Sequence, residues 1–267
     1  MSKPLVISIH NYKTAGVTFY SIIDRQFKKD EILNTDLLGL ESALSIITQS
    51  KPEKIKIVHG HFYFGIDKHF ARQHTYITFL RNPIERVISD YYYCRSNPLA
   101  HNYIYASKLS FKEYLQCDQV LNIDNGQTRF ISGETNMPYG SDSVEILGKA
   151  ISNLEHKFSL VGITEKFDES LLIANQIFSW SQYYYASKNI TSCKSHDFDE
   201  ETWELLKKRN ALDLQLYDYA LKRHTKDFGK IPFAGVKMFF LKVLKKIYTV
   251  TQPTYSSSKK FFIRKDK

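Results

Sequence analysis

The chain has 267 residues, of which 43% are apolar and 14% aromatic, so it can form one large or two small domains with a substantial core. Its net charge of +9 is concentrated at the C-terminus, because residues 235–267 hold nine basic residues and one acidic residue. The near-neutral remainder excludes a general nucleic-acid-binding surface, and we expect neither a membrane span nor a secretory signal.

The three cysteines, Cys94, Cys117 and Cys193, are odd in number and far apart in the sequence. They form no Cys-x-x-Cys pair, which argues against a disulfide framework or a zinc ribbon. We therefore predict a reducing, cytoplasmic location.

Four apolar runs of strand length are each followed by a helical pattern. The strands are expected at residues 5–9, 55–58, 76–80 and 158–163, and the helices that follow them at 16–29, 67–73, 83–95 and 167–178. Continuous apolar strands that alternate with helices indicate an α/β fold with a parallel sheet.

Other segments complete the predicted domain of residues 1–233. Further helices are expected at 110–117, 144–155 and 199–226. Asp197 or Asp199 is the expected N-cap of the last of these helices. Residues 118–143 are rich in Asp, Asn, Gly, Ser and Pro, and are predicted to form a long loop.

Residues 234–267 are predicted to form a basic amphipathic helix and a disordered tail outside that domain. On a helical wheel, apolar side chains of residues 234–250 gather on one side and most lysines on the other. The default interpretation packs the apolar side on the domain and leaves the lysines in solvent. The alternatives are peripheral contact with an anionic membrane and attraction of an anionic glycan.

The first predicted strand runs into the segment IHNYKTAGVT, residues 9–18, which opens the first helix. Ligands of parallel sheets bind at the carboxyl ends of strands, and a helix N-terminus there offers free N–H groups to an anion. Lys13 adds a positive charge, and Gly16 lets the backbone approach a ligand closely. The Walker A order of glycine before lysine is absent, which argues against a nucleoside triphosphate kinase. A surface loop with an incidental lysine is the alternative.

A second strand–loop–helix unit, TFLRNPIERVISDYYY, repeats this plan. Asn82 is expected to cap the helix, with Pro83 at its first position and Glu85 closing a capping box. Arg81 then stands at the end of a strand, where its guanidinium suits a phosphate, and Ser89 offers a further donor two turns later. An arginine that pairs with Glu85 is the alternative interpretation.

The segment VHGHFYFG, residues 58–65, also follows a strand and places His59 and His61 on either side of a glycine. Histidine is the usual general base near neutral pH. Metal ligation is an alternative, but no cysteine or acidic cluster nearby in the sequence completes a site. A histidine with a structural role at a strand end is the third interpretation.

These motifs together resemble the sulfotransferases that use 3′-phosphoadenosine 5′-phosphosulfate (PAPS), in the carbohydrate-acting branch that includes heparan sulfate 2-O-sulfotransferase and bacterial relatives. The family segment His-Ile-Pro-Lys-Thr-Ala-Gly-Thr-Thr is matched by residues 10–18, and Arg-Asp/Asn-Pro-x-x-Arg-x-x-Ser-x-Tyr-Tyr by residues 81–92. A Gly-His pair is matched by Gly60-His61. The resemblance extends over about residues 5–225 and includes the segments 124–133, 160–171 and 209–220.

The resemblance implies a P-loop-like parallel β-sheet flanked by helices, the sulfotransferase fold. It implies transfer of a sulfuryl group from PAPS to a hydroxyl of a glycan or other carbohydrate-like acceptor, without a metal. Arg81 and Ser89 would hold the 3′-phosphate, His61 would be the base, and Lys13 would neutralise charge on the leaving nucleotide. The residues implied to hold the 5′-phosphosulfate are Lys13, Thr14, Ala15, Gly16, Val17 and Thr18.

Three positions depart from the family pattern. Asn11 and Tyr12 replace Ile-Pro, and Val17 replaces a threonine. We expect the loop to be less rigid without its proline and the 5′ site to lose a hydroxyl, in an enzyme that stays active.

Three further residues have two interpretations each. His59 is expected either to orient His61 or only to pack. Gln127 and Arg129 are expected either to contact the acceptor or to hold their own loop together. For the whole chain, the alternative function is a non-catalytic nucleotide- or glycan-binding module on the same scaffold, which has no use for a base at His61.

Overall fold

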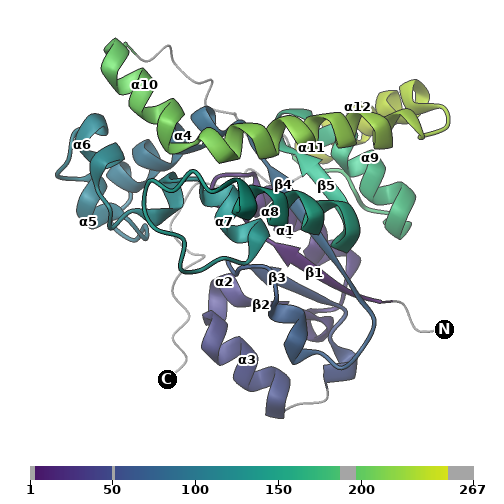
Figure 1. Ribbon diagram of the computed structural model, residues 1–267. Coiled ribbons are helices and arrows are strands. Elements are labelled where there is room, and N and C mark those ends of the chain that lie inside the picture. The colour runs from purple at the N-terminus through teal and green to yellow at the C-terminus, as the bar shows by residue number, and fades with distance from the viewer. Residues whose placement is uncertain (1–3, 50–51, 187–196, 252–267) are drawn as a thin grey trace.

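The computed structural model describes residues 4–49, 52–186 and 197–251, which form an α/β fold around a parallel sheet (Figure 1). The strands are β1 (Leu5–Ile9), β2 (Ile32–Asn34), β3 (Ile57–Gly60), β4 (His74–Leu80) and β5 (Phe158–Ile163), in the order β2-β3-β1-β4-β5. All four pairs of neighbours are parallel. The prediction of an α/β fold with a parallel sheet is confirmed. Strand β2 was not predicted, because three residues are too few to give a periodic sequence pattern.

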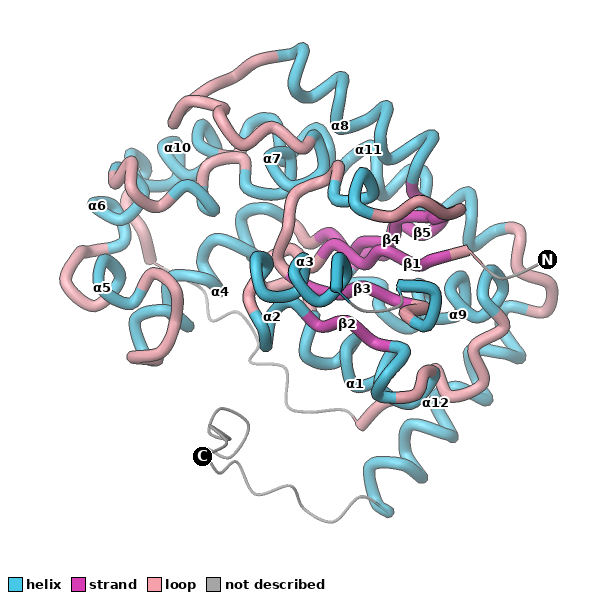
Figure 2. Tube along the Cα trace, turned by 90° about the horizontal axis from the view of Figure 1, so that it is seen from below, coloured by secondary structure: helices cyan, strands magenta, loops and turns pink. Residues whose placement is uncertain are grey.

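Strand residues alternate between two apolar cores, one on each face of the sheet. Leu5 and Ile7 belong to the first core, whereas Val6 and Ile77 belong to the second. The first core is covered by α3 (Leu40–Gln49), α7 (Gly126–Ser132), α8 (Val144–Lys157) and α11 (Ala211–Gly229). The second is covered by α1 (Gly16–Gln26), α9 (Phe167–Phe178) and α12 (Ala234–Thr251), as Figure 2 shows.

A third apolar cluster lies beyond the carboxyl end of β4. It joins α4 (Pro83–Ser96), α5 (Tyr103–Ala106), α6 (Phe111–Gln116) and α10 (Glu200–Arg209). Val87 and Tyr91 of α4 pack there against Tyr114 of α6, and Leu206 of α10 closes the cluster. This packing fixes α4 as it leaves the sheet, so α4 can position side chains at the sheet edge.

Three predicted elements differ from the structure. The helix expected at 67–73 is reduced to a short 3-10 turn at Ile66–His69, because β4 begins at His74 and leaves no room for another turn. The long loop expected at 118–143 contains α7 and a 3-10 turn at Leu121–Ile123. The helix expected at 199–226 is divided into α10 and α11.

Two local interactions explain the ends of α10. Asp199 is its N-cap, and its carboxylate accepts a 2.7 Å hydrogen bond from the N–H of Thr202. Asn210 separates α10 from α11, because its side chain donates to the Leu206 carbonyl (3.0 Å) while its backbone leaves the helical conformation. The predicted disordered tail falls within residues 252–267 and lies outside the described residues, as does Cys193.

Candidate active site

The three predicted motifs meet at the carboxyl edge of the sheet, because the strands that precede them are neighbours. Ile9, the last residue of β1, pairs with Gly60 of β3 on one side and with Thr78 of β4 on the other. The loop after β1, the histidines around the end of β3 and the residues after β4 therefore leave the sheet side by side. This is the edge at which parallel sheets bind ligands.

The loop after β1 has an unusual backbone held by buried side chains. Lys13 and Ala15 both have φ of 64°, a left-handed conformation that costs a non-glycine residue on the order of 1 kcal/mol or more. The amide of Asn11 donates to the hydroxyl of Thr78 (2.9 Å) and to the carbonyl of Phe79 (3.3 Å). Asn11 thus ties the loop to β4, so the expected loss of rigidity without proline is offset by these bonds.

Within the predicted phosphosulfate loop, Thr14 does not present its hydroxyl. The side chain is buried, and the hydroxyl donates to the carbonyl of Asn11 at 2.8 Å. Val17 is exposed, and Ala15 and Thr18 are half-buried. Among the described residues no side chain caps the first N–H groups of α1. The loop therefore offers a ligand the charge of Lys13 and backbone N–H groups rather than the threonine hydroxyl.

Gly16 has a second role besides the expected close approach of a ligand. A Cβ atom at this position would lie 1.7 Å from Nε2 of His10. The absence of a side chain therefore lets the His10 ring lie against the first turn of α1, and that ring belongs to the histidine cluster described below.

Lys13 and Arg81 are neighbours in the structure. The guanidinium of Arg81 donates from Nη1 to the carbonyl of Lys13 at 3.3 Å. The Arg81 Nη2 atom also lies 3.9 Å from the carboxylate of Glu85, so the alternative pairing with Glu85 exists alongside this contact. The guanidinium of Arg81 thus contacts the loop that carries Lys13 through the backbone of Lys13, not through its ammonium group.

One row of side chains on α4 borders both cations. Glu85, Ser89 and Tyr93 follow one another at intervals of four residues and therefore lie on one face of the helix. Arg81 contacts Glu85 at one end of the row, and the ammonium of Lys13 lies 3.9 Å from the ring centroid of Tyr93 at the other. Ser89, half-buried, lies between them. Tyr93 had no predicted role, because a run of three tyrosines does not reveal which one faces a cation.

Gln127 holds Arg81 rather than an acceptor. Its side-chain amide accepts from the N–H of Arg81 and donates to the carbonyl of Arg81, both at 2.9 Å. Arg129 is also buried, paired with Asp124 at 2.6 Å and bonded to the carbonyls of Met137 and Pro138. Neither side chain reaches the surface, so this geometry corrects the expectation of acceptor contact in favour of a supporting role.

His61 lies in a stack of aromatic rings. The Tyr12 ring lies 3.9 Å from it on one side and the His10 ring 4.1 Å on the other, centroid to centroid. The stack continues from Tyr12 to His101 (4.2 Å) and from His10 to His59 (5.2 Å). Tyr12, which replaces the proline of the family pattern, therefore holds one face of the predicted base.

Hydrogen bonds determine which nitrogen of His61 is available. Nδ1 lies 2.6 Å from the carbonyl of His10 and must donate to it, so Nε2 carries the free lone pair of the neutral ring. The side chain is 26% exposed, and Nε2 lies 3.9 Å from a carboxylate oxygen of Asp36. His59 is buried, with Nδ1 bonded to the hydroxyl of Ser8 at 2.9 Å, so a supporting role suits it better than direct contact with substrate.

Asp36 organises this histidine cluster and was not predicted. Its carboxylate accepts hydrogen bonds from Nδ1 of His10 and from the N–H of His61, both at 2.7 Å. Gly60 makes room for Thr35 and Asp36, because a Cβ there would lie 1.8 Å from the Thr35 hydroxyl and 3.0 Å from a carboxylate oxygen of Asp36. Asp36 lies in the first turn of α2 (Thr35–Leu38), after the short strand β2, so no periodic pattern pointed to it.

In the sequence, no acidic cluster near His59 and His61 completes a metal site. In the structure, Asp36 supplies an acidic group. Ligand atoms of His10, Asp36 and His61 lie within 4.8 Å of one another. Both oxygens of Asp36 are already engaged by hydrogen bonds in the described structure. The three residues could therefore ligate a metal ion, but Asp36 also forms hydrogen bonds with His10 and His61 that hold His61 in place.

The electrostatics of the cluster favour the neutral forms of His59 and His61 beside an ionised Asp36. Burial, and then the proximity of His10, lower the pKa of His61 to about 3, and the same two causes lower that of His59 to about 3. Burial alone would raise the pKa of Asp36, but the hydrogen bond and charge of His10 outweigh it and hold that pKa below its ordinary value.

The charge of Lys13 is tuned by its surroundings. Burial lowers its pKa, the carboxylate of Asp90 opposes this effect, and the guanidinium of Arg81 adds to it. Asp90 itself is fully buried, where it accepts hydrogen bonds from Tyr114 (3.2 Å) and Asn122 (3.0 Å). A partly desolvated ammonium of this kind interacts strongly with an anion.

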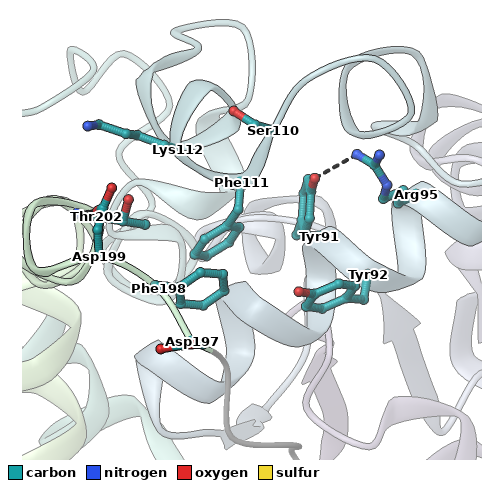
Figure 3. A pocket seen from close by; sticks show the side chains of 10 residues that line it. All are labelled: Tyr91, Tyr92, Arg95, Ser110, Phe111, Lys112, Asp197, Phe198, Asp199 and Thr202. Atoms are coloured by element: carbon teal, nitrogen blue, oxygen red, sulfur yellow. Dashed lines mark hydrogen bonds between the residues drawn. The ribbon is translucent and has the colours of Figure 1, made fainter.

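A pocket of about 520 Å³ lies on another side of α4 (Figure 3). It is lined by Tyr91, Tyr92, Arg95, Ser110, Phe111, Lys112, Asp197, Phe198, Asp199 and Thr202. Several of its polar groups serve the fold: Arg95 donates to the Tyr91 hydroxyl (2.7 Å), and Asp199 caps α10. The pocket is distinct from the row of Glu85, Ser89 and Tyr93, and we assign it no role in the candidate site.

The chain matches the family model described as Galactose-3-O-sulfotransferase over residues 40–236. The match extends over most of the sequence and includes His61 and Arg81. The chain belongs to this family. No curated protein sequence matches the chain.

Membership defines this protein as a carbohydrate sulfotransferase, and the parallel sheet flanked by helices is consistent with a sulfotransferase fold. The carbohydrate-acting family predicted from the motifs is confirmed, whereas the finer likeness to heparan sulfate 2-O-sulfotransferase is not. The match begins after the loop of Lys13, so the place of that loop in the site of the sulfotransferase rests on its contact with Arg81.

Proposed function

We propose that this sulfotransferase transfers the sulfuryl group of PAPS to a hydroxyl of a galactose-bearing glycan. The observation that carries the proposal is the contact between Arg81 and the backbone of Lys13. It joins the guanidinium of Arg81 to the loop of Lys13 at one sheet edge. Tyr12 of that loop stacks on His61, whose Nε2 carries the lone pair. The acceptor class is taken from the name of the family, and the donor from the resemblance of residues 10–18 and 81–92 to PAPS-dependent enzymes.

The proposed donor site uses backbone and side-chain groups in different places. The N–H groups at the start of α1 and the ammonium of Lys13 bind the 5′-phosphosulfate. Arg81 binds the 3′-phosphate with its guanidinium, and Ser89 contributes its hydroxyl. Gln127 positions Arg81 through hydrogen bonds to its backbone, and the carboxylate of Glu85 lies 3.9 Å from its guanidinium.

The reaction proposed here is an in-line displacement at sulfur. Nε2 of His61 accepts the proton of the acceptor hydroxyl, the acceptor oxygen forms a bond to sulfur, and the bond between sulfur and the bridging phosphate oxygen breaks. The electron pair stays on that oxygen, where Lys13 neutralises the charge as adenosine 3′,5′-bisphosphate departs. The low pKa of His61 keeps its lone pair available at neutral pH, although it makes the free ring a weak base.

The test combines donor binding with turnover in the purified protein. Wild-type protein should bind PAPS and release adenosine 3′,5′-bisphosphate when galactose-terminated acceptors are added. His61→Ala should keep donor binding and lose about 10²- to 10⁴-fold in turnover. The matched control is His156→Ala, which removes an exposed histidine of α8 and should leave both properties unchanged.

Two results would contradict parts of this proposal. Normal turnover by His61→Ala would show that the base is another group. PAPS binding without turnover of any glycan acceptor would favour the alternative function, a nucleotide- or glycan-binding module on the same scaffold.

A further inference from the structure

Helix α12 is firmly attached to the domain by one of its faces. Leu241 is fully buried in the second core. The ammonium of Lys245 bonds both oxygens of Asp168 and the hydroxyl of Tyr185, each at 2.8 Å. Tyr248 accepts a hydrogen bond from Arg25 of α1 at 3.2 Å. These contacts, spaced over two turns, fix which side of α12 faces outward.

The outward side of α12 is apolar. At 100° per residue, its exposed apolar residues form one continuous arc opposite Leu241. They are Val236, Phe239, Phe240, Val243, Leu244, Ile247 and Val250, and their exposed fractions run from 37% for Leu244 to 78% for Val250. Phe233, just before the helix, is 80% exposed. The default prediction, in which the apolar side packs on the domain, is therefore wrong for most of this helix.

Lysines flank the exposed apolar arc. On the wheel, Lys242 and Lys246 lie along one border and Lys237 along the other. The helix contains no aspartate or glutamate, and residues 252–267 add five basic residues and one acidic residue. An apolar arc with basic borders is typical of helices that lie in the interface of an anionic membrane.

We propose that α12 binds the surface of an anionic lipid bilayer. The apolar arc enters the boundary between headgroups and acyl chains, and the flanking lysines contact the phosphate groups. Within the described residues, no helix has the length and apolar character to cross a bilayer, so α12 lies in the plane of the membrane. Its opposite face stays on the domain, which α12 thereby holds against the membrane.

Charge decides between a lipid surface and a second copy of the chain. In a symmetric dimer through the arc, the basic borders of two α12 helices would meet, and neither helix offers a carboxylate to pair with them. An anionic bilayer supplies phosphates along both borders. The proposal does not depend on the sulfotransferase reaction, since it uses none of the residues of the candidate active site.

Flotation of the full-length protein with liposomes tests the proposal without an activity assay. Vesicles of phosphatidylcholine with phosphatidylserine should carry the protein to the top of the gradient, and vesicles of phosphatidylcholine alone should carry much less. Replacing Phe239, Phe240 and Ile247 together by serine should reduce binding at least about tenfold. Lys242→Gln with Lys246→Gln should weaken binding to the anionic vesicles roughly 10- to 30-fold and reduce its dependence on salt.

The control replaces two apolar residues elsewhere on the protein that are more exposed than those of the arc variant, Leu99→Ser and Val144→Ser, and should leave flotation unchanged. Circular dichroism spectra establish that each variant is folded. Absence of wild-type flotation with anionic vesicles, or equal flotation of the arc variant, would overturn the proposal. Sedimentation that shows a dimer lost in the arc variant, without flotation of the wild type, would instead assign the arc to a second copy.

Discussion

The loops after β1 and after β4 share one plan but start their helices differently. At α4, the side chain of Asn82 accepts hydrogen bonds from the N–H groups of Ile84 and Glu85 (3.1 and 3.2 Å), and Pro83 has no N–H to offer. At α1, no side chain among the described residues occupies the corresponding N–H groups. Within the described part of the chain, the N–H groups at the start of α1 therefore have no side-chain cap, whereas those at the start of α4 are capped by Asn82.

The predicted capping box at α4 is replaced by a tertiary contact. The backbone N–H of Asn82 donates to the carboxylate of Glu165, in the 3-10 turn that follows β5, at 2.8 Å, and not to Glu85. Glu85 faces Arg81 instead. An anion near α1 can therefore use backbone N–H groups, while an anion near α4 depends on the guanidinium of Arg81. The same local motif gives a backbone site in one loop and a side-chain site in the other.

The largest difference between the loops should appear in turnover when Lys13 is replaced. Lys13→Ala should lower kcat at saturating PAPS by about 10²- to 10³-fold, because the charge that stabilises the leaving phosphate is lost. Steady-state kinetics with a galactose-terminated acceptor measure this effect. Lys112→Ala, on α6, is the control and should leave kcat unchanged. A normal kcat in Lys13→Ala would show that the β1 loop does not act on the leaving group.

Replacement of Arg81 should act on binding rather than on the chemical step. Arg81→Ala should weaken PAPS binding roughly 10- to 100-fold, the range for loss of a charge-assisted contact, and should largely preserve kcat at saturation. Isothermal titration calorimetry measures the affinity. Glu85→Gln is the matched control, since it removes the carboxylate beside the guanidinium and should leave affinity equal or higher. Equal PAPS affinity in Arg81→Ala and wild type would remove Arg81 from the donor site.

Loss of the α4 cap should affect stability and not donor binding. Asn82→Ala should lower the free energy of unfolding by about 1 kcal/mol, as for other N-cap replacements, with PAPS affinity unchanged within about twofold. Urea denaturation and calorimetry give the two values. Ser110→Ala, which removes the cap of α6, should show a similar loss of stability. If Asn82→Ala weakens PAPS binding as much as Arg81→Ala, the N-terminus of α4 belongs to the anion site after all.

The smallest effect is expected when the pH is lowered, and it concerns His61. An ordinary histidine with a pKa near 6.5 loses about 90% of its basic form by pH 5.5. Burial lowers the pKa of His61 to about 3, so the free protein keeps the basic form as the pH falls through that range. We expect kcat/KM, which reports on the free enzyme, to change less than about twofold between pH 8 and 5.5 on account of His61. A fall in kcat/KM with a midpoint near pH 6.5 that disappears in His61→Gln would contradict a buried, neutral His61 in the free enzyme.

The pattern of strands and helices could be predicted where it is long and regular. Continuous apolar runs revealed four of the five strands in the described part of the chain, and helical periodicity revealed α1, α4, α8 and α9. The helix α7 was missed because its polar residues are satisfied by distant partners: Asp213 of α11 accepts from the N–H groups of Gln127 and Thr128. A segment whose polar groups pair only after folding looks like a loop in the sequence.

The candidate site divides in the same way. Lys13, Arg81 and His61 stand at strand ends that the sequence reveals, and the structure brings all three strands together. Thr14, Gln127 and Arg129 were predicted from their chemical type and from the resemblance to the family, and each turns inward to a buried partner. Side-chain type indicates what a residue is able to bind, but burial determines whether a ligand can reach it.

By itself, the sequence determined the alternation of strands and helices, the cationic and histidine residues at strand ends and the family, because these depend on patterns over a few neighbouring residues. Tertiary structure decided that Asp36 joins the histidines, that His61 is stacked and neutral, and that the apolar side of α12 faces outward. The physical reason is that burial is a property of the whole fold. A helical wheel shows that a helix has two faces, and only packing against other elements decides which of them meets the protein.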